Sequence, residues 1–120
     1  RRIGAASAFH YTMPVLATSD RMIERDPAVV AAGLRAIVKV QRALKADVSL
    51  AAEVGRKLFP PAEAAVIGDV VARDLPYYEP AISEKTVVKM NGFARAVGLL
   101  KTSPPYDQVV ARQFSPLWTA

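Results

Sequence analysis

The sequence of 120 residues lacks cysteine and contains a single histidine, His10. Without cysteine there can be no disulfide, no thiolate nucleophile and no cysteine-based zinc site. The motifs of zinc proteases, P-loop proteins, dinucleotide-binding proteins and α/β-hydrolases are missing as well. A Ser-His-Asp set could be drawn from Ser19, His10 and Asp20, but nothing in the sequence positions an oxyanion hole. We therefore expect no catalytic residue, no metal site and no cofactor.

Long apolar runs are also missing, since none approaches the ~20 residues that a transmembrane helix needs. No signal peptide is visible. The chain begins with Arg1 and Arg2 and has no initiator methionine. We therefore expect the natural protein to have residues upstream of Arg1, and the absence of a signal says little about export.

The charged residues are few and scattered. They make up 22% of the chain, whose formal net charge is +5. Such a balance attracts polyanions, but no basic cluster is interleaved with aromatic residues. Residues 82–91 weakly resemble the recognition helix of a DNA-binding protein. The link before them, residues 75–80, is too long and rigid for a helix-turn-helix. We expect no nucleic-acid partner. The apolar share of 52% is sufficient for the core of one domain, or of part of one.

The longest segment with an unbroken helical period is residues 26–45. Asp26 can cap the first amides, and Pro27 suits the first helical position. Two neighbouring faces of this helix are apolar, which predicts cover on two sides. The first face holds Val30, Leu34, Ile37, Val38, Gln41 and Leu44, and the second holds Val29, Gly33, Ala36, Val40 and Ala43. A narrow basic wedge of Arg35, Lys39 and Arg42 either contacts an anion or is a solvated face, and we favour the solvated face.

Residues 8–18 are the only convincing strand, because they are rich in β-branched and aromatic residues. Pro14 cannot donate to a ladder and indicates an edge or a crossing between layers. Everything after Thr18 is predicted to be helix, cap or proline-rich link. The strand therefore has no partner within the chain, and we expect the isolated chain either to self-associate through it or to order it only against another part of the protein. The whole chain should be mainly α, with about five helices after one N-terminal strand.

The expected helices after the strand are separated by caps and prolines. They cover residues 21–25, 27–45, 49–58, 61–75, 83–97 and 107–114. The helix that begins after Ser83 should bury Thr86, Met90, Phe93 and Val97, and Gly98 stands where a left-handed residue is wanted, with Leu99 packing back. Asp107 should cap the last helix. Tyr77 and Tyr78 lie in an extended link, where they either stack on a ligand or, as we favour, anchor the link to the core.

Several short motifs occur in an order that resembles a known family. They are Tyr11-Thr-Met-Pro-Val-Leu-Ala-Thr-Ser-Asp20, Asp26-Pro27, Ala46-Asp47, Arg73-Asp-Leu-Pro-Tyr-Tyr78, Ile82-Ser-Glu84, Met90-Asn-Gly-Phe-Ala94, Val97-Gly-Leu-Leu100 and Pro105-Tyr-Asp107. This order resembles the C-terminal part of substrate-binding proteins of ABC importers, in the nitrate, sulfonate and taurine group that is related to thiamine-pyrimidine synthases. The resemblance covers nearly the whole chain from about His10.

The resemblance implies an α/β parent protein with two lobes around a cleft, the type II periplasmic binding fold. Residues 1–120 would be its C-terminal portion, with a crossing strand at 8–18 and a helical lobe segment at 19–120. The implied function is capture of a small organic anion, such as an aliphatic sulfonate or taurine, and delivery to an ABC permease. The implied location is the periplasm or the cell surface, with membrane contact only through the transporter or a lipid anchor.

The same resemblance singles out His10, Tyr11 and Thr12 as ligand-binding residues, because crossing strands of two-lobed binding proteins run past the ligand. The His10 imidazole could hold an anionic head group, although a lone histidine in a strand is more often structural. Two other functions stay open: an enzyme fragment like the thiamine-pyrimidine synthases, whose reactive motifs would lie outside this chain, and a structural helical domain without a ligand.

Overall fold

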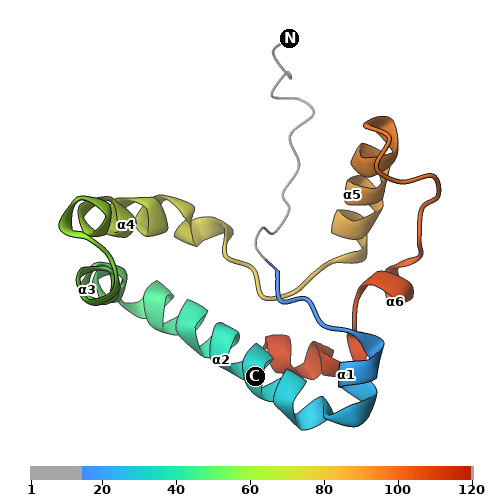
Figure 1. Cartoon of the computed structure of the whole chain (residues 1–120), viewed down its shortest axis with the longest axis horizontal. Helices are drawn as coiled ribbons and strands as arrows, with labels where there is room; N and C mark the ends of the chain where they lie inside the picture. Colours follow the sequence, from blue (N-terminus) through green and yellow to red (C-terminus); the bar gives the residue numbers. More distant parts are fainter. Residues whose placement is uncertain (1–14, 120) are drawn as a thin grey trace.

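The computed structural model describes residues 15–119, and these residues are mainly helical (Figure 1). The elements in chain order are α1 (Asp20–Arg25), α2 (Pro27–Ala46), α3 (Ser49–Leu58), α4 (Pro61–Asp74), η2 (Leu75–Tyr77), α5 (Glu84–Ala96), α6 (Tyr106–Val109) and η3 (Arg112–Trp118). Within this range there is no strand. The prediction of a mainly helical chain is therefore confirmed.

The predicted strand at residues 8–18 falls mostly outside the described residues. Its last four residues, 15–18, are described and have no regular secondary structure, so the strand prediction is wrong for them. Val15 and Leu16 are exposed large apolar side chains. With no neighbouring strand in residues 15–119 to supply hydrogen bonds, β propensity alone cannot hold this segment in a strand.

The first two helices begin where the capping residues predicted. The Ser19 hydroxyl accepts a hydrogen bond from the Met22 amide at 3.3 Å, and a carboxylate oxygen of Asp26 accepts one from the Val29 amide at 3.2 Å. Pro27 occupies the first turn of α2, where no amide hydrogen is needed. These caps separate α1 from the 20 residues of α2 and confirm the predicted boundaries.

Helix α2 runs along the lower part of Figure 1. Helices α3 and α4 lie at its C-terminal end, α1 lies at its N-terminal end, and α5 lies at the upper right of the view. Helices α3 and α4 pack closely. Each helix has a glycine that faces a side chain of the other helix. A Cβ atom on Gly55 would lie 3.4 Å from the Ile67 Cδ1 atom, and one on Gly68 would lie 3.3 Å from the Ala52 Cβ atom. On α4, Ala64 is buried and Ile67 is half-buried.

The link between α4 and α5 is only partly extended. Leu75–Tyr77 form a 3₁₀ turn, so the prediction of an extended link is wrong for Tyr77, because the end of α4 continues through it as a tighter turn. Tyr77 is exposed and Tyr78 is half-buried. Helix α5 then begins as predicted, with the Ser83 hydroxyl accepting from the Thr86 amide at 3.1 Å.

The covered face of α5 differs from the predicted one. Val87 and Asn91 are buried and Met90 is half-buried, whereas Phe93 is 49% exposed and Val97 is exposed as well. The predicted face followed a spacing of four, three and four residues from Thr86. The face that packs inward is shifted by one residue and contains Val87, Asn91 and Ala94. The side chain of Phe93 lies beyond the core.

The C-terminus of α5 ends at the predicted glycine. Gly98 has a φ of 79°, the left-handed region, and the Leu99 amide donates to the Ala94 carbonyl at 2.8 Å. Leu99 does not pack back, since it is 76% exposed. The hydrogen bonds alone therefore close this helix end, without the apolar contact that often accompanies them.

The last segment is two short pieces and not one helix. Helix α6 ends at Val109, and η3 runs from Arg112 to Trp118 along α2. Asp107 lies inside the first turn of α6, whose cap position is Pro105, so Asp107 does not cap it as predicted. Val110 and Phe114 are buried as expected for the side that faces the body.

Only one of the two apolar faces of α2 is covered in the described structure. Val38 on the first face is 4% exposed, but Val40 on the second face is 57% exposed and Val29 is also exposed. The prediction of cover on two sides is therefore wrong for residues 15–119, because no described element packs on the second face. No helix in this range is both long enough and apolar enough to span a membrane.

Candidate ligand groove

The predicted ligand-binding residues His10, Tyr11 and Thr12 lie outside the described residues. Within residues 15–119, no group of three or more histidine, cysteine, aspartate or glutamate side chains could hold a metal ion. The candidate site therefore has to be sought among the cavities of the described part.

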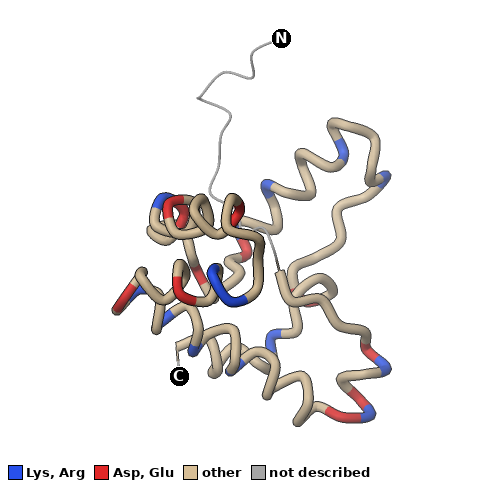
Figure 2. The backbone as a smooth tube through the Cα atoms, turned by 60° about the vertical axis from the view of Figure 1, so that its left-hand side comes forward, with Lys and Arg blue, Asp and Glu red and all other residues tan. Residues whose placement is uncertain are grey.

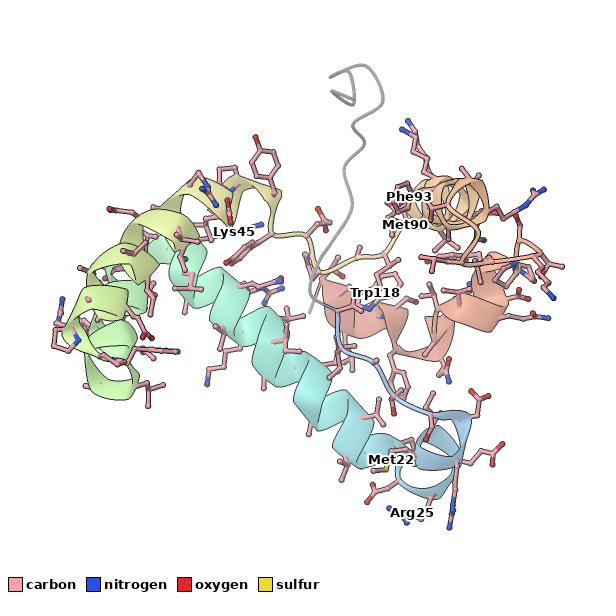
Figure 3. All side chains as sticks on the ribbon, turned by 45° about the horizontal axis from the view of Figure 1, so that its top comes forward. Met22, Arg25, Lys45, Met90, Phe93 and Trp118 are labelled. Carbon is pink, nitrogen blue, oxygen red and sulfur yellow. The ribbon has the colours of Figure 1, made fainter. Side chains whose placement is uncertain are left out.

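A groove of about 590 Å³ opens between α2, the segment before α1, the start of α5 and the chain from α6 to η3. Its size lies within the range of small-molecule sites. Its floor is apolar and includes Leu16, Leu34, Val38, Met90, Phe114 and Trp118. Figure 3 shows Met90 on α5 and Trp118 on η3, two elements far apart in the sequence.

Three long-range hydrogen bonds hold the walls of the groove. The Arg42 guanidinium donates to the Thr119 carbonyl at 2.8 Å and fixes the end of η3 against α2. The Asn91 amide group donates to the Pro104 carbonyl at 2.8 Å, and the Tyr106 hydroxyl donates to the Ile82 carbonyl at 2.5 Å. These two bonds tie α5 to the returning chain, so the groove has defined walls.

The ionisable residues that line the groove are all acidic. They are Asp20 at the start of α1, Glu79 in the link before α5, and Asp107 in α6. One Glu79 carboxylate oxygen accepts from the Ala81 amide at 3.3 Å, which restrains that side chain. No lysine or arginine is among the described lining residues, although basic residues outnumber acidic ones in the chain (Figure 2).

One polar atom beside the groove has no hydrogen-bond partner among residues 15–119. It is the side-chain oxygen Oε1 of Gln41, a buried atom of a lining residue on α2. Buried polar atoms are nearly always satisfied, because an unmade hydrogen bond costs free energy. The Oε1 atom of Gln41 can therefore accept a hydrogen bond from a donor that reaches it.

The basic wedge of α2 lies apart from the groove. Arg35 and Lys39 are exposed and do not line it, and Arg42 is engaged with Thr119. The ion pair of Arg73 with Asp74 at 2.8 Å is an exposed contact between sequence neighbours and contributes little. The basic wedge and this ion pair therefore lie outside the groove.

Sequence reasoning did not find this groove. Met90 lies on α5 and Phe114 and Trp118 lie on η3, and only the tertiary arrangement brings these two elements together. The nearest signal in the sequence is Trp118, the only tryptophan of the chain, which stands on the element that packs along α2.

Comparison with known protein families, with curated proteins and with solved structures found no match to this chain.

Proposed function

We propose that the chain is the C-terminal part of an extracytoplasmic solute-binding protein of an ABC importer, which captures a small organic anion such as an aliphatic sulfonate or taurine. The support from the sequence is the order of the motifs between His10 and Asp107. Several of these motifs are helix boundaries, and the ends of α2 at Asp26-Pro27 and Ala46-Asp47 and of α5 at Gly98 agree with them.

The observation that carries the proposal is the uncovered second face of α2. Val29 and Val40 are exposed there, on a helix whose opposite side is buried at Val38. Helices with two apolar faces occur between layers, and in α/β proteins one of those layers is a sheet. A parent fold with two α/β lobes would supply the missing layer from residues outside this chain.

The first experiment is to read the gene upstream of the Arg1 codon in the same frame. The proposal expects an export signal and enough coding sequence for a first lobe. A start codon immediately before Arg1 would contradict the parent fold. It would favour a structural helical domain instead.

The second experiment addresses the ligand in the complete protein. Thermal-shift measurements with aliphatic sulfonates, taurine, nitrate and pyrimidines should show stabilisation by one of the anions. Stabilisation by a pyrimidine alone would favour the relatives of the thiamine-pyrimidine synthases.

The third experiment tests the proposed ligand residues. His10→Ala and Tyr11→Phe in the complete protein should weaken binding of the anion, since each removes one hydrogen-bonding group from a desolvated site. We expect a loss of about tenfold, equal to ~1.4 kcal/mol, for at least one of them. Arg35→Gln on the solvated face of α2 is the control. Affinities within twofold of the unmodified protein for both variants would show that the crossing strand does not hold the ligand.

A further inference from the structure

We propose that the groove between α2, α5 and η3 binds a small organic cation, an ammonium group carried on an apolar body. This proposal concerns other residues than the anion site proposed above, which is assigned to His10, Tyr11 and Thr12. The proposal is argued from the charge, the floor and the unpaired acceptor of the groove.

The charge of the groove is opposite to that of the whole chain. The chain has 16 lysine and arginine residues against 11 aspartate and glutamate residues. The described lining of the groove nevertheless contains Asp20, Glu79 and Asp107 and no basic side chain. A concave surface lined by one sign of charge concentrates ions of the opposite sign. An organic anion would be repelled here, and a cation would be attracted.

The floor of the groove suits an apolar body attached to that cation. Leu34, Val38 and Met90 provide aliphatic surface, and Phe114 and Trp118 provide aromatic rings. Burying the apolar body removes it from water, and an ammonium group near the face of an indole is attracted by the ring. A free metal ion or ammonium ion has no apolar body to bury on this floor, so the ligand class is an alkyl- or arylammonium.

The Gln41 amide adds a directional contact. Its Oε1 atom is buried without a partner, and the last torsion of a glutamine side chain has a broad energy profile. A modest rotation would turn this oxygen toward the groove, where an ammonium N–H could donate to it. Ligand binding would then satisfy an acceptor that the described structure leaves unsatisfied.

The test uses the only tryptophan of the chain, Trp118, which lines the groove. The complete chain is titrated with three ligands that share one apolar body: hexylammonium, hexanol and hexanesulfonate. Hexylammonium should produce a saturable change in Trp118 emission. Hexanol should bind at least roughly fivefold more weakly because it lacks the charge, and hexanesulfonate more weakly still.

Isosteric variants assign the contacts. Glu79→Gln combined with Asp107→Asn should weaken hexylammonium binding roughly fivefold or more and should reduce its dependence on salt. Gln41→Leu should weaken it roughly threefold to tenfold. The matched control is Arg35→Gln combined with Lys39→Gln, which also removes two charges but lies away from the groove. The control should leave hexylammonium affinity within twofold.

Three results would overturn the proposal. Equal affinities for hexanol and hexylammonium would show that charge does not select the ligand. Unchanged affinity in the Glu79 and Asp107 variant would place the cation elsewhere. A Trp118 signal that follows protein concentration and not hexylammonium would show that a second copy fills the groove. Failure of the anion proposal would appear separately, as no thermal shift with sulfonates in the complete protein.

Discussion

At the scale of single residues, Asn91 joins α5 to the chain that returns from it. Its side chain is 9% exposed and donates to the Pro104 carbonyl at 2.8 Å. A buried amide is tolerated in a helix face only when its hydrogen bonds are made. Asn91 therefore holds Pro104 against α5. Helix α6, which forms one wall of the groove, begins two residues later.

We predict that Asn91→Ala destabilises the protein by about 1 to 3 kcal/mol, because the Pro104 carbonyl loses its donor and a small cavity forms. The neighbouring Gly92→Ala is the control. A Cβ atom at Gly92 would meet nothing within 4 Å, and alanine favours the helix, so this variant should be as stable as the unmodified chain or more stable. Urea unfolding of both variants measures the difference, and equal midpoints would contradict the structural role of Asn91.

Asp47 is a second residue whose chemistry can be tested alone. The Ser49 hydroxyl and amide donate to one carboxylate oxygen of Asp47 at 2.7 and 3.0 Å. These two hydrogen bonds, the side-chain one first, lower the pKa of Asp47 below its ordinary value. Together they hold the chain where α2 ends and α3 begins.

The direction of the pH effect follows from the lowered pKa. The ionised carboxylate contributes stability above the unfolded pKa of about 3.9, and this contribution is lost as the pH falls through the lower pKa of the folded state. Asp47→Asn should therefore be less stable than the unmodified chain near pH 6, and the difference should shrink as the pH falls below the unfolded pKa. Thermal unfolding at several pH values checks this. A difference that does not change with pH would rule out the carboxylate as the cause.

At the scale of elements, the sequence predicted helix boundaries well and helix faces less well. Ser19, Asp26, Ser83 and Gly98 act through contacts within a few residues, so their roles could be read locally. The inner face of α5 could not, because Phe93 is more apolar than Asn91 and only the position of Pro104 explains why Asn91 is inside. The groove likewise depends on packing between distant segments, and the predicted residues His10, Tyr11 and Thr12 lie outside the described part.

Helix α2 allows the sharpest comparison, because two valines two residues apart lie in opposite environments. Val38 is 4% exposed and Val40 is 57% exposed. In this chain Val38→Ala should cost about 1.5 to 3 kcal/mol from lost burial and a cavity, and Val40→Ala should cost less than about 0.5 kcal/mol. Chemical denaturation of the two variants measures both values. Equal costs in this chain would mean that another element covers the second face.

The same pair of variants tests the proposed parent fold when it is made in the complete protein. If a sheet of a first lobe packs on the second face of α2, Val40→Ala should become as costly as Val38→Ala. If Val40→Ala costs little stability in the complete protein as well, no other part of the protein packs on the second face of α2. The uncovered face would then no longer support the proposed function.

At the scale of the whole molecule, few apolar residues of the described part are buried, and many large ones are exposed. The buried apolar residues are Val38, Ala51, Ala64, Val87, Val110 and Phe114, whereas many large apolar residues on α2, α3, α4 and α5 are exposed. The radius of gyration is 16.9 Å, compared with about 14 Å for a compact domain of this length. Apolar surface of this extent normally marks contact with another protein surface.

We predict that the isolated chain associates with itself. Light scattering should give a mass above the 12.9 kDa of one chain, and the dye ANS should bind, because the exposed valines, Leu58 and Phe59 gain free energy by leaving water. Val29→Ser combined with Val40→Ser should reduce both signals if the second face of α2 is part of the contact. The matched control is Val88→Ser on α5, which is exposed to a similar degree. A monodisperse monomer that binds no ANS would mean that residues 1–14 cover this surface within the same chain, since Ala120 is the only other residue outside the described range.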